Sequence, residues 1–273
     1  MNGSGPPSLD EAAAAAPRFD RGKGPRDRLE GDRMAEAFFW GALSSSALLV
    51  GAYCAYRFRP GPRLIAAVMA LGSGLLLGSI SFELVDEALK TRTVAWVALF
   101  VLIGAATFTA GDWVLSRRGG GDRKDPGGAQ AQGSPLAIVL GSVLDGIPES
   151  FVLGLTVLQG GVSVALLVGV VLSNLPEGMA SSSGLRAAHW PRRRVLVMWL
   201  AVVGISALSS VAGYALLDPA ADRTGALMQA YAAGALLAML SDTLLPESYE
   251  IEGLFTGPFV VAGFAVSLAL SAI

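Results

Sequence analysis

Two short stretches of this sequence each place a proline and a glutamate inside a strongly apolar run. One is DGIPES, which starts at Asp145, and the other is SNLPEG, which starts at Ser173. In a helix, Asp145 and Glu149 are four residues apart and share a face. Ser173 and Asn174 reach the face of Glu177 through spacings of four and three residues. Carboxylates, an amide and a hydroxyl that converge in this way predict an oxygen-rich site for a cation.

Prolines in these apolar segments add backbone oxygens to the same regions. Proline has no N–H, so it frees the carbonyl group four residues earlier in a helix. Such irregular backbone is tolerated in a bilayer only inside protein or against a watery cavity. The prolines are Pro148, Pro176 and Pro246, and the freed carbonyls are those of Leu144, Leu172 and Asp242. The carboxylate of Asp242 therefore joins the candidate ligands.

Burying these acids in a membrane would be unfavourable unless their charge were neutralised. A single acid at the centre of a membrane helix costs about 2.5–3.5 kcal/mol, so Asp145, Glu149, Glu177 and Asp242 together cost on the order of 10 kcal/mol. A divalent cation bound among them would neutralise the cluster, and so would protonation of some of the acids. The plainer interpretation is a proline kink with a protonated, hydrogen-bonded acid that serves packing.

The composition predicts an all-α, polytopic membrane protein. Of the 273 residues, 53% are hydrophobic and only 15% are charged, whereas about a quarter of a soluble protein is charged. A membrane-spanning helix needs about 20 mostly apolar residues. We expect eight such helices, at about 37–56, 64–89, 94–115, 136–158, 162–185, 195–217, 225–247 and 254–273.

Two polar segments interrupt this pattern. Residues 1–34 are rich in Gly, Pro and mixed charge, a composition that buries too little apolar surface to fold. We therefore expect a disordered N-terminal tail followed by a transmembrane domain over residues 35–273. The segment 117–135 is charged and rich in glycine, and is expected to be a flexible cytoplasmic loop.

The composition also excludes several classes of function. The single cysteine and the single histidine rule out a disulfide framework, a CxxC zinc site and a histidine-rich loop. The net charge of −2 and the absence of a basic stripe give no sign of nucleic-acid binding. No cofactor is expected.

The distribution of Lys and Arg predicts the orientation. Links after the first, third, fifth and seventh segments hold most of these residues, including the arginine-rich link 186–194, whereas the other links hold Lys90, Arg92 and Arg223. Positive loops face the cytoplasm, so both termini are expected outside it, in a plasma (inner) membrane. The arginine-rich link also fits the anionic headgroups of the cytoplasmic leaflet.

Two internal similarities predict an inverted repeat. DGIPES aligns with SNLPEG, and GLLLGSISFELVDE from Gly74 aligns with GALLAMLSDTLLPE from Gly234. Both pairs join segments that cross in opposite directions, which is typical of transporters whose substrate site lies near the midplane between repeats.

These motifs resemble those of the ZIP (Zrt/Irt-like) family of divalent metal transporters. The resemblance covers residues 35–273, and its specific part is DGIPES, SNLPEG and SDTLLPES. It implies eight helices in a 3+2+3 inverted-repeat bundle and transport of zinc, with manganese or iron as alternatives, into the cytoplasm. The metal would be bound by Asp145, Glu149, Ser173, Asn174, Glu177 and Asp242.

Several positions differ from the family pattern. Asp145 and Gly146 stand where the family usually has histidine and asparagine, and Ser173 replaces a histidine or glutamine. Zinc favours nitrogen and sulfur ligands, while oxygen ligands suit harder ions such as Mn²⁺. This site is therefore expected to bind zinc more weakly than a site with imidazole ligands.

Two other functions stay open. The missing histidines motivate a degenerate, non-transporting relative that senses metal or serves a structural role. An intramembrane hydrolase with paired carboxylates is a third alternative, but the sequence has no GxSxG, no HExxH and no histidine within a membrane segment, so we expect no enzyme. Small residues in the helices would allow a homodimer.

Overall fold

The computed structural model describes residues 25–117, 135–216 and 222–272, and every regular element in these ranges is a helix. The chain divides into two units, Met1–Asp32 and Arg33–Ile273. Within the first unit, the structure describes residues 25–32, which are helical. The expected loop at 117–135 lies almost wholly outside the described residues.

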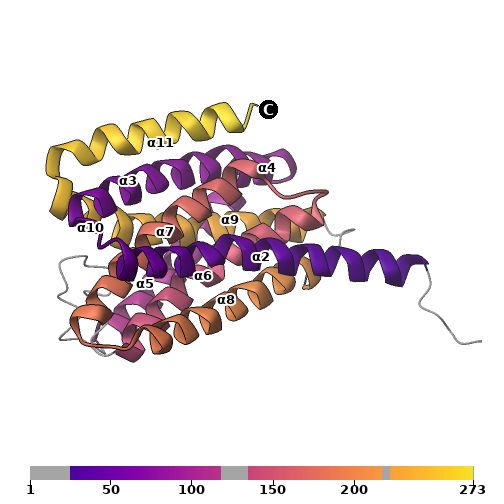
Figure 1. Ribbon diagram of the computed structural model, residues 1–273. Helices are drawn as coiled ribbons and strands as arrows, with labels where there is room; N and C mark the ends of the chain where they lie inside the picture. The colour runs from indigo at the N-terminus through magenta and orange to yellow at the C-terminus, as the bar shows by residue number, and fades with distance from the viewer. Residues whose placement is uncertain (1–24, 118–134, 217–221, 273) are drawn as a thin grey trace, which may run out of the picture. The chain divides into compact units, whose positions relative to one another are not determined.

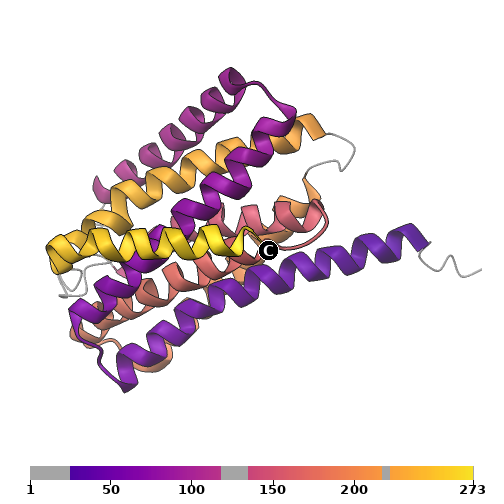
Figure 2. The same ribbon diagram turned by 90° about the horizontal axis from the view of Figure 1, so that it is seen from above.

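The helices pack side by side in a bundle (Figures 1 and 2). Most are α-helices; η1 and η4 are π-helical turns and η5 is a 3₁₀ turn. In chain order they are α2 (Pro25–Arg57), α3 (Pro62–Ser79), η1 (Ile80–Val85), α4 (Asp86–Thr91), α5 (Val94–Leu115), α6 (Pro135–Leu158), α7 (Val164–Ala187), α8 (Arg192–Ala215), α9 (Asp222–Met239), η4 (Leu240–Leu244), α10 (Leu245–Glu252), η5 (Gly253–Phe255) and α11 (Thr256–Leu270).

Part of the segment expected to be a disordered tail, residues 25–34, is helical. Helix α2 begins at Pro25, so residues 25–34 are helical, and residues 1–24 lie outside the described part of the chain. Proline suits the first turn of a helix because its φ is already helical and its missing N–H would have no partner there. Adding turns to an existing helix is also far easier than starting a new one. The Arg33 side chain donates a hydrogen bond to the carbonyl oxygen of Val157 at 3.1 Å.

Seven stretches of the described chain are long and apolar enough to cross a membrane. All eight segments expected from the sequence fall on helices, but the last two lie in one helical run of 47 residues, Thr224–Leu270. A straight α-helix of that length would be about 70 Å long, more than twice the thickness of a bilayer core. The run turns at Gly253, whose φ of +60° ends α10. This backbone conformation favours glycine because it has no Cβ.

Local sequence signals fix several helix ends. Ser163 precedes α7 and its hydroxyl accepts a hydrogen bond from the Leu166 N–H at 3.1 Å, as expected of an N-cap. At the other end of α7, His189 has a φ of +62°, and the Trp190 N–H donates to the Leu185 carbonyl at 3.0 Å. This pattern is a Schellman motif with histidine in the position usually taken by glycine.

Glycines set how closely the helices approach. A Cβ built on Gly74 of α3 would collide with the Val260 carbonyl of α11, and one on Gly263 of α11 would collide with the Leu71 carbonyl of α3. In each case the carbonyl that the Cβ would meet lies three residues before the glycine of the other helix. Small residues of this kind let membrane helices pack backbone against backbone, and α3 and α11 lie side by side in Figure 1.

Helices α5 and α9 cross in the same register. A Cβ on Gly104 would meet the Tyr231 carbonyl, and one on Gly234 would meet the Val101 carbonyl. Each of these carbonyls again lies three residues before the glycine of its own helix. Figure 2 shows the two helices running side by side. Gly74 and Gly234 are the residues that the sequence alignment pairs. The π-helical turns η1 and η4 follow these two glycines and begin at Ile80 and Leu240.

The largest apolar core lies where α3, α6, α7 and α9 meet. Its fully buried side chains include Leu76, Leu153, Leu166 and Leu236. The helices that carry the two proline–glutamate motifs therefore lie in the interior of the bundle.

Candidate cation site

Helices α6 and α7 carry five of the six residues that the sequence predicts as ligands, and all five are buried. Their exposed fractions are 1% for Asp145, 2% for Glu149, 1% for Ser173, 3% for Asn174 and 3% for Glu177. Both helices remain α-helical through their internal prolines. The irregular backbone expected at Pro148 and Pro176 is thus absent from α6 and α7 in the described structure, and three carboxyl groups lie inside an apolar bundle.

One hydrogen bond joins the two motifs directly. The Ser173 hydroxyl of α7 donates to Glu149 Oε1 of α6 at 3.2 Å, and it also lies 3.0 Å from the Val170 carbonyl of its own helix. The bond therefore joins the first residue of one motif to the glutamate of the other. A hydroxyl has a single proton, so Ser173 can serve only one of these acceptors fully, which leaves its lone pairs available to a cation beside Glu149.

Asn174 points toward a different neighbour from Ser173. Its amide Nδ2 lies 3.5 Å from the carbonyl oxygen of Ser44 in α2. The approach of α2 to α7 is close, because a Cβ on Gly51 would collide with the Leu175 carbonyl. Asn174 thus extends the polar region from the interface of α6 and α7 to α2.

Asp242 has an environment unlike that of the other five residues. It lies in the π-helical turn η4, is exposed, and accepts a hydrogen bond from Thr109 Oγ1 of α5 at 3.0 Å. The irregular backbone predicted near Pro246 occurs here, since η4 ends at Leu244, two residues before that proline. π-Helical turns are frequent at functional sites. The described contact of Asp242 is with α5, whereas those of Glu149 and Asn174 are with α7 and α2.

The carboxyl groups do not form a compact metal centre. Among the residues that the structure describes, no three side chains of His, Cys, Asp or Glu come together closely enough to hold a metal ion. A cation between α6 and α7 would therefore depend on hydroxyl, amide or backbone oxygens as well as carboxylates, such as those of Ser173 and Asn174.

The carbonyl freed by Pro176 meets another helix. A Cβ built on Gly72 of α3 would lie 2.7 Å from the Leu172 carbonyl oxygen. The absence of a side chain at Gly72 lets the two backbones approach at this point. The Leu172 carbonyl is thus surrounded by protein and not by a watery cavity. Protein is one of the two environments in which irregular backbone is tolerated inside a bilayer.

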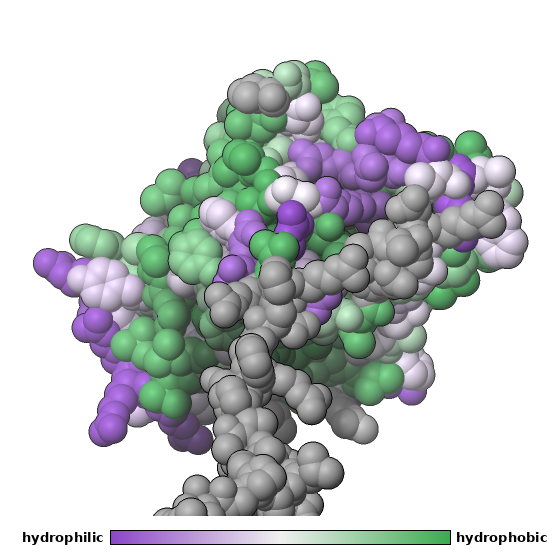
Figure 3. Space-filling view, turned by 90° about the vertical axis from the view of Figure 1, so that its right-hand side faces the viewer, coloured by the Kyte–Doolittle hydropathy of each residue, from purple (hydrophilic) through white to green (hydrophobic). Residues whose placement is uncertain are grey.

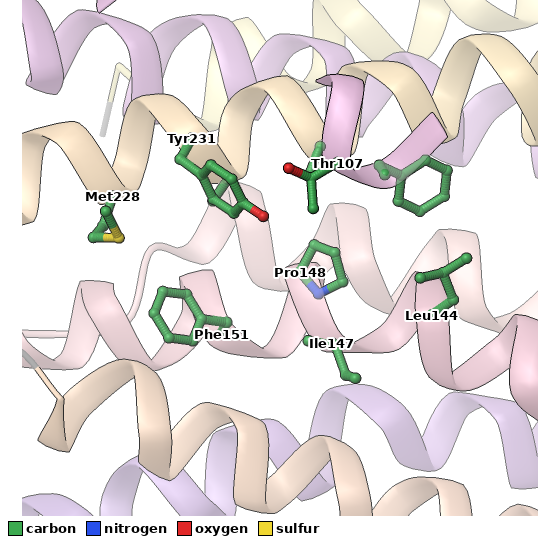
Figure 4. A pocket seen from close by; sticks show the side chains of 10 residues that line it. Thr107, Leu144, Ile147, Pro148, Phe151, Met228 and Tyr231 are labelled. Atoms are coloured by element: carbon green, nitrogen blue, oxygen red, sulfur yellow. The ribbon is translucent and has the colours of Figure 1, made fainter. Parts of the chain in front are cut away.

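An apolar cavity of about 260 Å³ lies on the proline side of α6. Figure 4 shows Pro148, Leu144 and Phe151 of α6 on one side of it, and Thr107 of α5 with Tyr231 and Met228 of α9 on the other. At 100° per residue, Asp145 and Glu149 point roughly 120° away from these residues. The cavity therefore does not hydrate the acids.

A polar cavity of about 400 Å³ lies where η1 and α4 meet the link between α6 and α7. Glu83 and Glu87 line it together with Thr156, Gln159, Gly161, Ser163, Phe82 and Ser271. The Ser271 hydroxyl donates to Glu83 Oε1 at 3.3 Å, and Lys90 forms an ion pair with Glu87 at 2.6 Å. Figure 3 views this end of the bundle and shows hydrophilic residues among hydrophobic ones.

Sequence reasoning did not identify two of the contacting residues. Ser44, which is fully buried, belongs to a run of three serines in α2 that could have indicated a polar helix face. Thr109 bears no motif, and its link to Asp242 depends on the crossing of α5 and α9. No model of a known protein family matches this chain, and no curated protein matches it at a significant level.

Proposed function

We propose that this membrane protein transports divalent metal cations, with zinc as the first candidate and manganese or iron as alternatives. The observation that carries the proposal is the burial of Asp145, Glu149 and Glu177 in two neighbouring membrane-spanning helices, joined by the bond from Ser173 to Glu149. Acids inside membrane segments are expensive and usually mark ion pathways. The resemblance of the motifs to those of the ZIP family supports the same function.

We infer that a cation binds between α6 and α7, with Glu149 and Ser173 at the centre. Asp145 shares the helix face of Glu149, while Asn174 and Glu177 would contribute from α7. Such a set consists entirely of oxygen atoms, which suits harder divalent ions. Asp242 would contact the cation at a different stage of its passage, since it hydrogen-bonds Thr109 of α5.

The proposed architecture is a 3+2+3 inverted repeat with eight crossings. It is supported by the matching registers of the crossings at Gly74 and Gly263 and at Gly234 and Gly104. The positions of η1 and η4 after aligned glycines support it too. The turn at Gly253 would separate the seventh crossing from the eighth. In such proteins, alternating access follows from movement of one group of helices against the other.

The proposed direction is toward the cytoplasm. The arginine-rich links favour a cytoplasmic location for one end of the bundle. The polar cavity with Glu83 and Glu87 lies at the opposite end, where its two carboxylates would attract a cation before it enters.

Uptake into proteoliposomes tests the proposal. The purified protein is reconstituted with a metal-sensitive dye inside, and the initial rate of Zn²⁺, Mn²⁺ and Fe²⁺ influx is measured for Glu149→Gln and Glu177→Gln. We expect the rate at low metal concentration to fall about tenfold or more, because a contact with a charged ligand contributes about 1.5–3 kcal/mol.

Glu250→Gln is the matched control, since Glu250 is an exposed residue of α10 and the substitution removes the same charge. Its influx should stay close to that of the unmodified protein. If Glu149→Gln and Glu177→Gln retained full influx of all three metals, these residues would not carry transport.

One observation favours a second function, a metal-sensing or structural membrane protein that does not transport. It is the lack, among the described residues, of three His, Cys, Asp or Glu side chains close enough to bind a metal. Calorimetry distinguishes the two functions. Micromolar binding of Zn²⁺ or Mn²⁺ together with influx supports the transporter, binding without influx supports the sensor, and neither binding nor influx supports the structural role.

A further inference from the structure

Arginine side chains stack on aromatic rings at one end of the bundle. The guanidinium carbon lies 5.4 Å from the ring centre in the pair Arg57–Phe58 and 5.1 Å in the pair Arg192–Tyr53. Two further pairs, Arg117–Trp113 at 3.8 Å and Arg194–Trp190 at 4.1 Å, follow the same pattern. All four arginines lie at the C-terminal ends of α2 and α5 or at the start of α8.

The first two pairs form one continuous cluster. The rings of Tyr53 and Phe58 meet edge to face, with 6.3 Å between their centres and an angle of 79°. Arg57 and Arg192 therefore flank a pair of touching rings, with one arginine from α2 and the other from α8. Both rings are exposed, Tyr53 at 43% and Phe58 at 65%, so the cluster opens onto the surroundings of the bundle.

Two hydrogen bonds fix α2 to the link between α7 and α8. The Tyr56 hydroxyl donates to the Trp190 carbonyl at 2.9 Å, and the Arg186 guanidinium donates to the Ala55 carbonyl. These bonds hold the two halves of the cluster in register. The cluster is thus an ordered surface rather than a set of independent side chains.

The electrostatics of this surface favour an anion. The links 57–63 and 186–194 contain seven arginines and no Asp or Glu. Within the described part of the chain, the ion pairs found between described residues are those of Lys90 with Asp86 and Glu87, and none joins a described carboxylate to Arg57 or Arg192. Helix α8 also begins here without a side-chain cap or an acidic residue in its first turn, and its N-terminal N–H groups add partial positive charge.

We propose that this cluster binds the phosphate of an anionic phospholipid, with Arg57 and Arg192 holding the headgroup and the rings of Tyr53 and Phe58 contacting the top of its acyl chains. Arginine forks match phosphate oxygens in pairs, and aromatic rings occupy the boundary between headgroups and acyl chains. The lipid is the favoured source of phosphate because the rings beside the arginines are exposed at the end of apolar membrane helices. A soluble phosphate would leave them uncovered.

Native mass spectrometry of the full-length protein tests this. The protein is released from a neutral detergent and titrated with phosphatidylglycerol, with phosphatidylcholine of the same chains, and with inorganic phosphate. We expect phosphatidylglycerol to bind most tightly. Arg57→Gln and Arg192→Gln should each weaken it about fivefold, and the double variant about thirtyfold, because each arginine near an anionic lipid contributes a similar increment.

Arg92→Gln is the matched control, since Arg92 lies at the opposite end of the bundle, after α4, and loses the same charge. It should bind phosphatidylglycerol as the unmodified protein does. The double variant Arg57→Lys/Arg192→Lys keeps the charge and removes the planar forks; it should lose part of the affinity while eluting as a single species in size-exclusion chromatography.

Three results would overturn the proposal. They are unchanged phosphatidylglycerol affinity in the Arg57→Gln/Arg192→Gln variant, an equal loss in Arg92→Gln, and inorganic phosphate that competes at the same concentration as the lipid. The last result would identify a site for a soluble anion instead. None of these measurements depends on metal transport.

Discussion

Alanine at Gly234 should loosen the crossing of α5 and α9. A Cβ at this position would collide with the backbone carbonyl of Val101, and a backbone atom cannot move aside without moving its helix. The two helices must therefore separate over the crossing and lose contacts on both sides. The same argument holds for Gly74, whose Cβ would collide with the Val260 carbonyl of α11.

The size of the effect follows from two opposing terms. Overpacking of a tight contact destabilises by about 1–3 kcal/mol, while alanine in place of glycine stabilises a helix by about 0.5–1 kcal/mol. The net loss should be about 1–2 kcal/mol, which for a chain of this size lowers the thermal midpoint by about 2–8 °C. Gly74→Ala should cost as much as Gly234→Ala, because the two crossings have the same register.

Gly204 supplies the matched control. It lies in the middle of α8, and a Cβ there would meet nothing within 4 Å. Gly204→Ala keeps only the gain in helix propensity and should raise the thermal midpoint by about 1–4 °C. Gly234→Ala and Gly204→Ala are the same chemical change, but the first should lower the thermal midpoint and the second should raise it.

A thiol-reactive dye provides the measurement. Cys54 is the one cysteine of the chain and is partly buried, so its labelling during heating in detergent reports unfolding near α2. Midpoints are compared at one scan rate, because membrane-protein unfolding is commonly irreversible. If Gly234→Ala shifted the midpoint upward like Gly204→Ala, the close crossing would be refuted. A neutral Gly74→Ala beside a damaging Gly234→Ala would refute the equivalence of the two crossings.

Two further substitutions probe the candidate site. Ser173→Ala should lower stability by about 1–3 kcal/mol, since buried Glu149 loses a hydroxyl donor; the dye assay measures this, and an unchanged midpoint would mean that the bond contributes nothing. Asp242→Asn should lower metal influx about twofold at most, because Asp242 would contact the cation only in passing and an amide oxygen can also accept the bond from Thr109. A loss as large as that of Glu149→Gln would instead place Asp242 in the same binding site as Glu149.

Much of the helical organisation could be predicted from the sequence. Long apolar runs must become helices in a bilayer, because each backbone group needs a partner within its own segment. The predicted segments therefore coincide with helices to within a few residues for most of the chain. The start of α2 was predicted about ten residues too late, because the composition of residues 25–34 is polar and a helix can extend beyond the bilayer without an apolar face.

The candidate site was only partly predictable. The proline–glutamate motifs identified five residues that prove to be buried, and a bond between Ser173 and Glu149 joins the two motifs. The motifs also predicted irregular backbone at Pro148 and Pro176, yet α6 and α7 continue as α-helices through both. Neighbouring helices can support a proline inside a membrane helix, so its presence alone does not locate a break.

The sequence by itself determined which segments are helical and which carry buried acids, since hydropathy and residue spacing act within one segment. Only the tertiary structure decided which partner each polar group has: Ser44 for Asn174, Thr109 for Asp242 and Tyr53 for Arg192. These pairings depend on where glycines allow two backbones to approach, and therefore on the registers of helices far apart in the chain. The spacing of apolar residues determines which face of a helix is buried. The position of that helix along its neighbour depends instead on how the two helices pack.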